Sequence, residues 1–237
     1  MSSLQDKVAY ITGGTKGIGY GVAQAMLEMG MRVAISGRHL EATQKAATSL
    51  GYSDRVLAVA SDVTNLQDEN NAVKQILEKW GQLDVVLANA GVGNFGAVDT
   101  LSEDAWKQMI DTNLTGAFFT LKASVEALKK SEGYYITLAS LAGTNFFAQG
   151  AGYNASKFGL VGFTQAAMLD LRKYGVKVST IMPGSVATYF NDHIPNDKDA
   201  WKIQPEDIGK LVIDLLTMHP RTLPSKIEVR PTRPDLK

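Results

Sequence analysis

The order of hydrophobic patterns along this 237-residue chain constrains its fold more than any other feature. Short apolar runs typical of strands recur at Val8–Thr12, Arg32–Ser36, Val56–Ala60, Val85–Ala88, Tyr134–Leu138, Lys177–Ile181 and Ile227–Val229. Longer helical patterns separate them, at Ile18–Met29, Leu40–Leu50, Leu66–Trp80, Glu103–Lys130, Ala155–Tyr174 and Pro205–Met218. This alternation predicts an α/β fold, a doubly wound parallel sheet of about seven strands with helices on both faces. No linker, repeat or break in composition interrupts the pattern, so residues 1–237 are interpreted as a single domain.

Composition excludes several classes of function. The chain has 24 Lys and Arg residues against 24 Asp and Glu residues, so no global charge favours nucleic acid or an anionic membrane as a partner. It has no cysteine, and its three histidines (His39, His193 and His219) are scattered, so we expect no metal site. We find neither a signal-peptide pattern at the N-terminus nor an apolar run of transmembrane length. A cytoplasmic protein is the expectation.

A glycine-rich segment follows the first predicted strand and leads into the first helix. It reads Thr12-Gly13-Gly14-Thr15-Lys16-Gly17-Ile18-Gly19. At such a turn, backbone N–H groups and the helix dipole can meet a pyrophosphate. In a Rossmann sheet, ligands bind beyond the carboxyl ends of the strands. We therefore predict a dinucleotide site here, with these contacts: Gly13, Thr15, Lys16, Gly17, Ile18 and Gly19.

The end of the second strand indicates which dinucleotide binds. An acidic residue there would hold the adenosine ribose hydroxyls and repel a 2′-phosphate. This chain instead has Ser36-Gly37-Arg38, with a hydroxyl and a guanidinium, and Lys16 offers a second cation nearby. NADP(H) is therefore the predicted cofactor. The alternative is that Arg38 is an ordinary solvated surface residue.

Tyr153 and Lys157 are spaced to share one face of a helix. A free tyrosine, with a pKa of about 10, is a poor acid or base at neutral pH. A lysine cation roughly 5 Å away, at an effective dielectric of about 20, would favour the phenolate by about 3 kcal/mol. This predicts a tyrosine pKa lowered by about 2 units. Tyrosine and lysine also occur at this spacing by chance on many solvated helix faces.

Six motifs in register resemble the short-chain dehydrogenase/reductase family over nearly the whole chain. The glycine loop matches its T-G-x-x-x-G-x-G pattern, and the catalytic set is matched in order and approximate spacing. The catalytic matches are Asn113, Ser140, Tyr153 and Lys157. The other matches, after the third, fourth and sixth strands, are Asp62-Val63, Asn89-Ala90-Gly91 and Pro183-Gly184-Ser185-Val186-Ala187-Thr188.

The resemblance implies an oxidoreductase that transfers hydride between nicotinamide and a carbonyl or alcohol carbon. In this scheme Tyr153 donates the proton, Ser140 hydrogen-bonds the developing charge, and Lys157 lowers the tyrosine pKa and holds the nicotinamide ribose. Asn113 is implied to hold a water that relays protons to the lysine. The implied cofactor contacts are Asp62, Val63, Asn89, Ala90, Gly91, Tyr153, Lys157, Pro183, Gly184, Val186 and Thr188. A homodimer or homotetramer is also implied, packed through the long helices around the fifth strand.

The substrate is less constrained by the sequence. Residues around 185–204 are expected to form a short lid. Three segments are expected to line the pocket: Val92–Phe95, Leu141–Gln149 and Ala187–Trp201. They contribute Phe95, Phe146, Phe147, Tyr189, Phe190, His193 and Trp201. This favours a medium-sized apolar or aromatic carbonyl compound and hence a carbonyl reductase or alcohol dehydrogenase. The alternative is a 3-oxoacyl-[acyl-carrier-protein] reductase, although the C-terminus departs from that subgroup. A non-catalytic nucleotide-sensing protein is a remote alternative.

Overall fold

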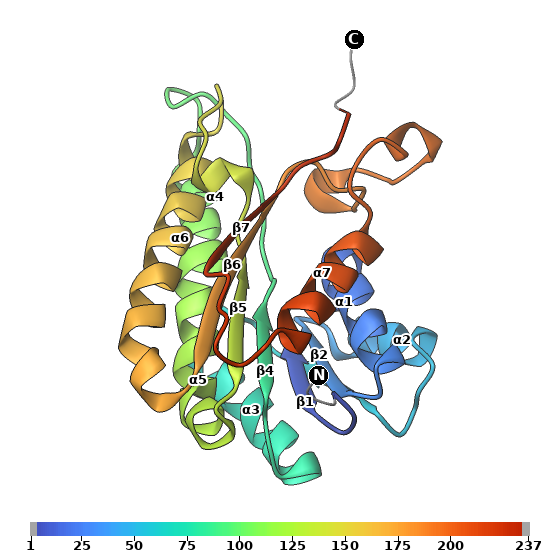
Figure 1. Cartoon of the computed structure of the whole chain (residues 1–237). Coiled ribbons are helices and arrows are strands. Elements are labelled where there is room, and N and C mark those ends of the chain that lie inside the picture. The colour runs from blue at the N-terminus through green and yellow to red at the C-terminus, as the bar shows by residue number, and fades with distance from the viewer. Residues whose placement is uncertain (1–3, 234–237) are drawn as a thin grey trace.

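The computed structural model describes residues 4–233, and its centre is a seven-stranded parallel sheet (Figure 1). The order across the sheet is β3-β2-β1-β4-β5-β6-β7, and every neighbouring pair of strands is parallel. The strands are β1 (Val8–Ile11), β2 (Arg32–Gly37), β3 (Val56–Ala60), β4 (Val85–Ala88), β5 (Tyr134–Leu138), β6 (Lys177–Pro183) and β7 (Lys226–Val229). The predicted doubly wound α/β fold is confirmed.

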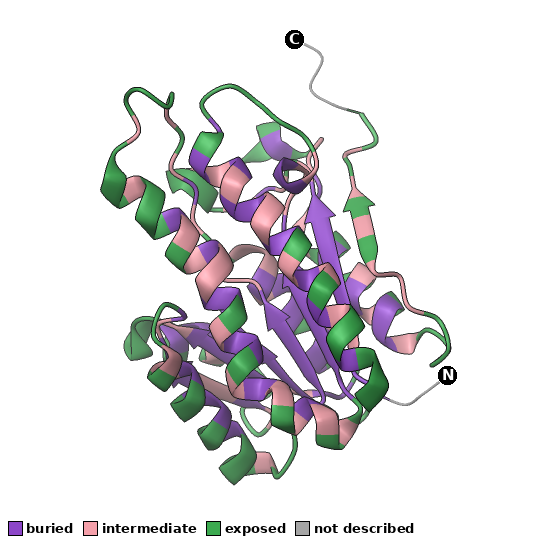
Figure 2. Ribbon diagram, turned by 90° about the vertical axis from the view of Figure 1, so that its left-hand side faces the viewer, coloured by how far each residue is buried: buried purple, intermediate pink, exposed green. Residues whose placement is uncertain are grey.

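Helices cover both faces of the sheet and form two separate hydrophobic cores with it. One face packs against α1 (Gly17–Glu28), α2 (Leu40–Ser49) and α7 (Pro205–Thr217). The other packs against α3 (Leu66–Trp80), α5 (Gly116–Ser131) and α6 (Ala151–Leu171), as Figure 1 shows. All residues of β1, β4 and β5 are consequently buried, as the colouring of Figure 2 makes plain. Burial on both faces explains why these strands read as continuous apolar runs.

The predicted helix Glu103–Lys130 has an interruption that the sequence pattern did not indicate. The structure divides it into α4 (Glu103–Ile110), a π-helical turn η1 (Asp111–Thr115) and α5. A π turn inserts one residue into the helical repeat and often marks a functional position. Here it contains Asn113, which is buried.

The end of the sheet that carries the predicted site is set by the strand order. β1 and β4 are neighbours, and the chain leaves them toward opposite edges of the sheet, so a crevice forms beyond their carboxyl ends. The glycine loop follows β1, Asn89 follows β4, and Ser140 follows β5 by two residues. Among the described residues, no helix is long and apolar enough to cross a membrane.

Candidate active site

The glycine loop is shaped by backbone conformations and contacts that side chains would prevent. Gly13 and Gly17 have φ of +64° and +57°, in the left-handed region that favours glycine. A Cβ on Gly19 would lie 2.6 Å from the side-chain nitrogen of Asn89 and 2.7 Å from the Gly13 carbonyl oxygen. No side chain caps the start of α1. Its first backbone N–H groups are therefore without a side-chain acceptor, as an anion-binding loop requires.

Asn89 fastens this loop to the end of β4. Its side-chain nitrogen donates to the carbonyl oxygens of Thr12 (2.8 Å) and Gly13 (3.0 Å). In return, the Thr12 hydroxyl accepts hydrogen bonds from the backbone N–H groups of Asn89 and Ala90. The loop is thus held in place, and its geometry fits the pyrophosphate of a dinucleotide.

The two cations predicted to recognise a 2′-phosphate are exposed, whereas the serine predicted to act with them is buried. Arg38 is exposed just beyond β2, with no hydrogen bond or ion pair in the described structure, and Lys16 is exposed in the glycine loop. Ser36, in contrast, is fully buried, and its hydroxyl is hydrogen-bonded to the Tyr10 hydroxyl at 3.1 Å. The prediction for Ser36 is therefore wrong, because this strand position points into the protein and not into the crevice.

Ser36 belongs to a buried polar cluster that sequence reasoning missed. The Glu69 carboxylate accepts hydrogen bonds from the hydroxyls of Tyr10 (2.9 Å) and Ser61 (2.6 Å). Burial raises the pKa of this carboxyl group, although the hydroxyl hydrogen bonds oppose the change. Nearby, Asp62 accepts from the backbone and side chain of Thr64, which fixes the turn after β3.

Tyr153 and Lys157 lie on one face of α6, as predicted. The helix begins at Ala151, four residues before the predicted start. The lysine nitrogen lies 5.7 Å from the centre of the tyrosine ring and donates to the Leu138 carbonyl oxygen at 2.9 Å. The Ser140 side chain lies close enough to Tyr153 to affect the pKa of its hydroxyl. The first two turns of α6 and the end of β5 therefore bring three of the four predicted catalytic residues together.

The predicted lowering of the tyrosine pKa is wrong for the protein alone. Burial raises the pKa of Tyr153 to about 12, with the Ser140 side chain opposing the rise. Burial likewise lowers the pKa of Lys157 to about 8. Both changes have one cause, because a poorly solvated site disfavours phenolate and ammonium alike. Desolvation thus exceeds the attraction between the two groups.

Asn113 is held on the π turn by three hydrogen bonds. Its side-chain oxygen accepts from the Val92 N–H, and its nitrogen donates to the Val92 carbonyl and to the Ser156 hydroxyl. A Cβ on Gly91 would lie 3.2 Å from that oxygen and 3.6 Å from the Lys157 nitrogen. Asn113 and Lys157 therefore converge at Gly91. Ser156, which joins Asn113 to the Tyr153 carbonyl, was not predicted.

The segment after β6 closes over the glycine loop. A Cβ on Gly17 would lie 3.3 Å from the Thr188 side chain, so the predicted contacts from these two distant segments lie side by side. Val186 pairs with Ile203 in a short bridge, while Pro183 ends β6 and is followed by Gly184, whose N–H bonds to the Val229 carbonyl.

Two of the predicted pocket aromatics, Phe95 and Phe190, lie against the Tyr153 ring, and Phe147 lies against Phe95. The Phe95 ring lies 5.4 Å from that of Tyr153, 5.6 Å from Phe147 and 6.4 Å from Phe190. Phe190 is also 5.7 Å from Tyr153. Phe146 stacks on Phe158 at 4.9 Å and is 81% exposed, so within the described residues it stands apart from this aromatic group, and its place in the pocket stays a prediction.

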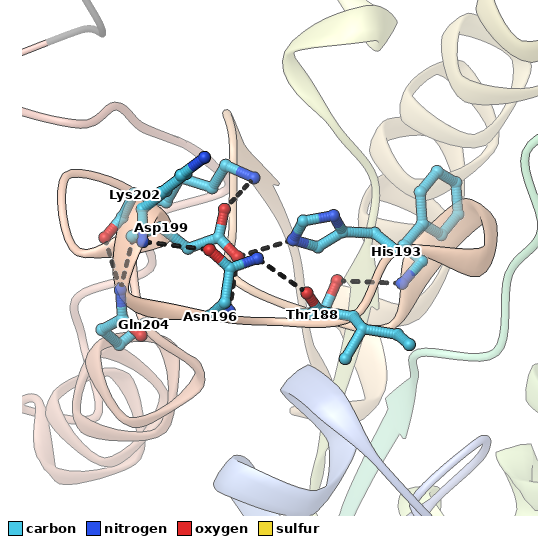
Figure 3. A network of polar contacts seen from close by, with 9 residues as sticks. Thr188, His193, Asn196, Asp199, Lys202 and Gln204 are labelled. Atoms are coloured by element: carbon cyan, nitrogen blue, oxygen red, sulfur yellow. Dashed lines mark hydrogen bonds and ion pairs between the residues drawn. The ribbon is translucent and has the colours of Figure 1, made fainter.

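A polar network centred on Asp199 braces the predicted lid (Figure 3). The buried Asp199 carboxylate contacts His193 and Lys202, each at 2.6 Å, and accepts from the Asn196 N–H at 3.0 Å. The hydrogen bonds from Lys202 and His193 hold the pKa of Asp199 well below its usual range. His193, predicted to line the pocket, is thus engaged in the lid itself. No motif or spacing in the sequence indicated a role for Asp199.

Comparison with known proteins agrees with this geometry. Residues 7–199 match the family model described as short chain dehydrogenase. The chain belongs to the short-chain dehydrogenase family. An uncharacterized oxidoreductase of Staphylococcus aureus strain USA300 is 34% identical over 232 residues, covering 98% of this chain and 100% of the relative. One from Staphylococcus saprophyticus is 32% identical, with the same coverage of each.

Solved structures of family members are similar over almost the full length. An alcohol dehydrogenase from the archaeon Thermococcus sibiricus, complexed with 5-hydroxy-NADP, superimposes with a TM-score of 0.91 at 30% identity, covering 98% of this chain and 100% of the other. A metagenomic short-chain oxidoreductase in complex with NADP gives 0.84 at 32% identity with the same coverage. A 3-ketoacyl-(acyl-carrier-protein) reductase from Brucella melitensis, complexed with NADH, gives 0.89 at 24% identity, covering 98% and 99%, which shows a shared fold.

Proposed function

We propose that this protein is an NADP(H)-dependent oxidoreductase that interconverts a carbonyl compound and a secondary alcohol. The observation that carries the proposal is the meeting of Ser140, Tyr153 and Lys157 opposite the glycine loop, with Asn113 held beside the lysine. These four side chains come from three separate parts of the chain: the π turn, the segment after β5 and α6. Packing alone does not require a buried lysine next to a buried tyrosine, because burying the ammonium is costly.

The side chains can supply the proton chemistry of carbonyl reduction. A bound nicotinamide would supply or accept the hydride. With a pKa of about 12, Tyr153 carries its proton at neutral pH and can donate it from Oη to the carbonyl oxygen. Ser140 can donate a second hydrogen bond to the same oxygen and stabilise its developing negative charge. In the opposite direction the phenolate must form, which the ammonium of Lys157 favours.

Arg38 and Lys16 support NADP(H) as the cofactor. Both are exposed, Arg38 just beyond β2 with no partner for its guanidinium within the described residues, and Lys16 in the glycine loop with its ammonium 5.7 Å from the centre of the Tyr189 ring. A free planar guanidinium suits bidentate binding of a phosphate. The Thermococcus sibiricus and metagenomic relatives were solved with NADP-type ligands. Ser36 is omitted from the proposed contacts because its side chain is buried.

The aromatic groups around Tyr153 support an apolar or aromatic substrate. Phe95, Phe147 and Phe190 approach the tyrosine ring or one another, and residues 185–204 form the proposed lid over them. Lys129, near the end of α5, is a basic residue that could attract an acidic acyl-carrier protein, but it already has partners within the protein. Lys129 is paired with Glu126 at 2.8 Å and lies over the Tyr174 ring. We therefore favour the function of a carbonyl reductase over that of an acyl-carrier-protein reductase.

The test is to follow oxidation of NADPH and, separately, NADH by the purified protein across a carbonyl panel. The panel holds aromatic ketones and aldehydes, diketones and a 3-oxoacyl thioester. We expect NADPH oxidation with aromatic or diketone substrates, and Tyr153→Phe should nearly abolish turnover while still binding NADPH. Preference for the thioester would support the acyl-carrier function instead. Substantial activity of Tyr153→Phe would refute the role of the tyrosine.

A further inference from the structure

A second cavity of about 390 Å³ adjoins the catalytic crevice. Its volume lies within the roughly 300–1,000 Å³ range of small-molecule sites. It lies between the segment after β4, the start of α4 and the tip of the lid, and its lining includes Asn94, Phe95, Thr100, Leu101, Ser102 and Asn191. Tyr153 does not line it, whereas Phe95 does and also contacts the tyrosine ring. Phe95 therefore joins the reacting centre to this cavity.

The cavity lining is polar but carries no charged side chain. The Ser102 hydroxyl accepts from the Ala105 N–H, which leaves its own hydrogen free to donate. Thr100 donates to the Ala97 carbonyl, which leaves its oxygen free to accept. The Asn191 side chain has no hydrogen bond within the described residues. The cavity thus offers both donors and acceptors to a neutral polar group.

An anionic ligand is disfavoured at this position. Glu103 and Asp104 occupy the first turn of α4, directly after Ser102. Their carboxylates already interact favourably with the positive end of the helix dipole and would repel a further negative charge. The Asn94 side chain, which donates to Gln108 at 2.7 Å, contributes no positive charge to offset them.

We propose that this cavity is a distal substrate subsite for a neutral hydrogen-bonding group, a carboxamide or a hydroxyl, on the tail of a ketone whose carbonyl reacts at Tyr153. The proposal rests on the proposed reductase function and names the substrate class more narrowly. The apolar part of such a substrate lies against Phe95 and its aromatic neighbours. The polar end passes Phe95 and bonds to Asn191 and to the hydroxyls near the start of α4.

Asn191 and Asp192 provide a matched pair of variants. Their φ angles are 56° and 59°, so glycine removes either side chain without straining the backbone. Only Asn191 lines the cavity. Asn191→Gly and Asp192→Gly therefore make similar changes to the lid backbone, but only the first removes a proposed substrate contact.

The experiment compares three acetophenones that carry an ethylene tail at the 4-position of the ring. The tails end in a carboxamide, a carboxylate or an isopropyl group. With the wild-type protein and NADPH, we expect a KM about tenfold lower for the carboxamide than for the isopropyl compound, the size of one net hydrogen bond. Asn191→Gly should erase most of that difference, and Asp192→Gly should retain it. Equal KM values for the three tails, or equal effects of the two variants, would overturn the proposal.

Failure of the reductase function can be separated from failure of the subsite. If no ketone is reduced, the proposed function fails, and calorimetric titration of the wild-type protein with the carboxamide and isopropyl compounds tests the cavity directly. Tighter binding of the carboxamide that disappears in Asn191→Gly supports the subsite. Equal binding of the two compounds overturns it.

Discussion

Lys157 is predicted to lower the free energy of unfolding of this protein, because its ammonium is buried. Its side chain is 4% exposed, and burial lowers its pKa from an ordinary value of 10.5 to about 8. At about 1.4 kcal/mol for each pH unit, burying the ammonium near neutral pH costs about 3 kcal/mol of folding free energy. Replacement by methionine, which is similar in length and uncharged, removes this cost.

The direction in which stability changes with pH follows from the number of protons bound by the folded and unfolded chain. Between pH 8 and 10.5 the unfolded chain keeps the lysine proton while the folded protein loses it, so wild-type stability rises with pH in this interval. The penalty is complete below pH 8 and disappears above 10.5. From pH 7 to 10 we expect the wild type to gain about 2.5 kcal/mol relative to Lys157→Met. This corresponds to roughly 5–10 °C in Tm for a chain of this size.

The assay is urea unfolding of both proteins at several pH values from 7 to 10. Losing the hydrogen bond to the Leu138 carbonyl costs Lys157→Met about 1 kcal/mol. That cost does not depend on pH, so the slope of the stability difference is the informative quantity. Tyr153 acts oppositely, because its pKa of about 12 makes it lose stability above pH 10. The effect of Lys157→Met is therefore also measured in a protein that carries Tyr153→Phe.

Lys130→Met, at an exposed position, controls for the loss of one positive charge. A stability difference between wild type and Lys157→Met that stays constant from pH 7 to 10 would refute the reasoning. It would mean that the lysine is solvated or paired in the folded protein to the same degree as in the unfolded chain.

Three further predictions concern the cofactor, the loop and assembly. Arg38→Asp should weaken NADPH binding by about tenfold or more, as expected for loss of one charge-assisted hydrogen bond, and NADH binding far less; equal losses in a fluorescence titration would contradict the phosphate contact. Gly19→Ala should destabilise the fold by about 1–3 kcal/mol in urea, because its Cβ meets Asn89 and the Gly13 carbonyl; unchanged stability would count against that packing. Phe118 is 44% exposed on α5, one of the two long helices expected to pack between subunits, and lies edge-on to Phe163 of α6, so Phe118→Lys should reduce the mass measured by light scattering; a monomeric wild type would contradict this expectation.

The sequence alone determined the architecture and the position of the crevice. Strand and helix periodicities are local properties, and the β-α alternation permits few topologies, so the seven-stranded parallel sheet was predictable. The glycine loop was also predictable, because the left-handed φ of Gly13 and Gly17 leaves a direct mark on the sequence. The spacing of Tyr153 and Lys157 was sufficient to place both on one helical face.

The tertiary structure decided the environments of the side chains. A strand buried on both faces has no polar alternation to orient Ser36, so only packing shows that its hydroxyl points inward toward Tyr10. The π turn at Asn113 and the lid network around Asp199 depend on partners distant along the chain or on loop geometry. The pKa of Tyr153 rises because solvation depends on everything packed around the phenol, whereas the sequence displays only its neighbour at the next helical turn.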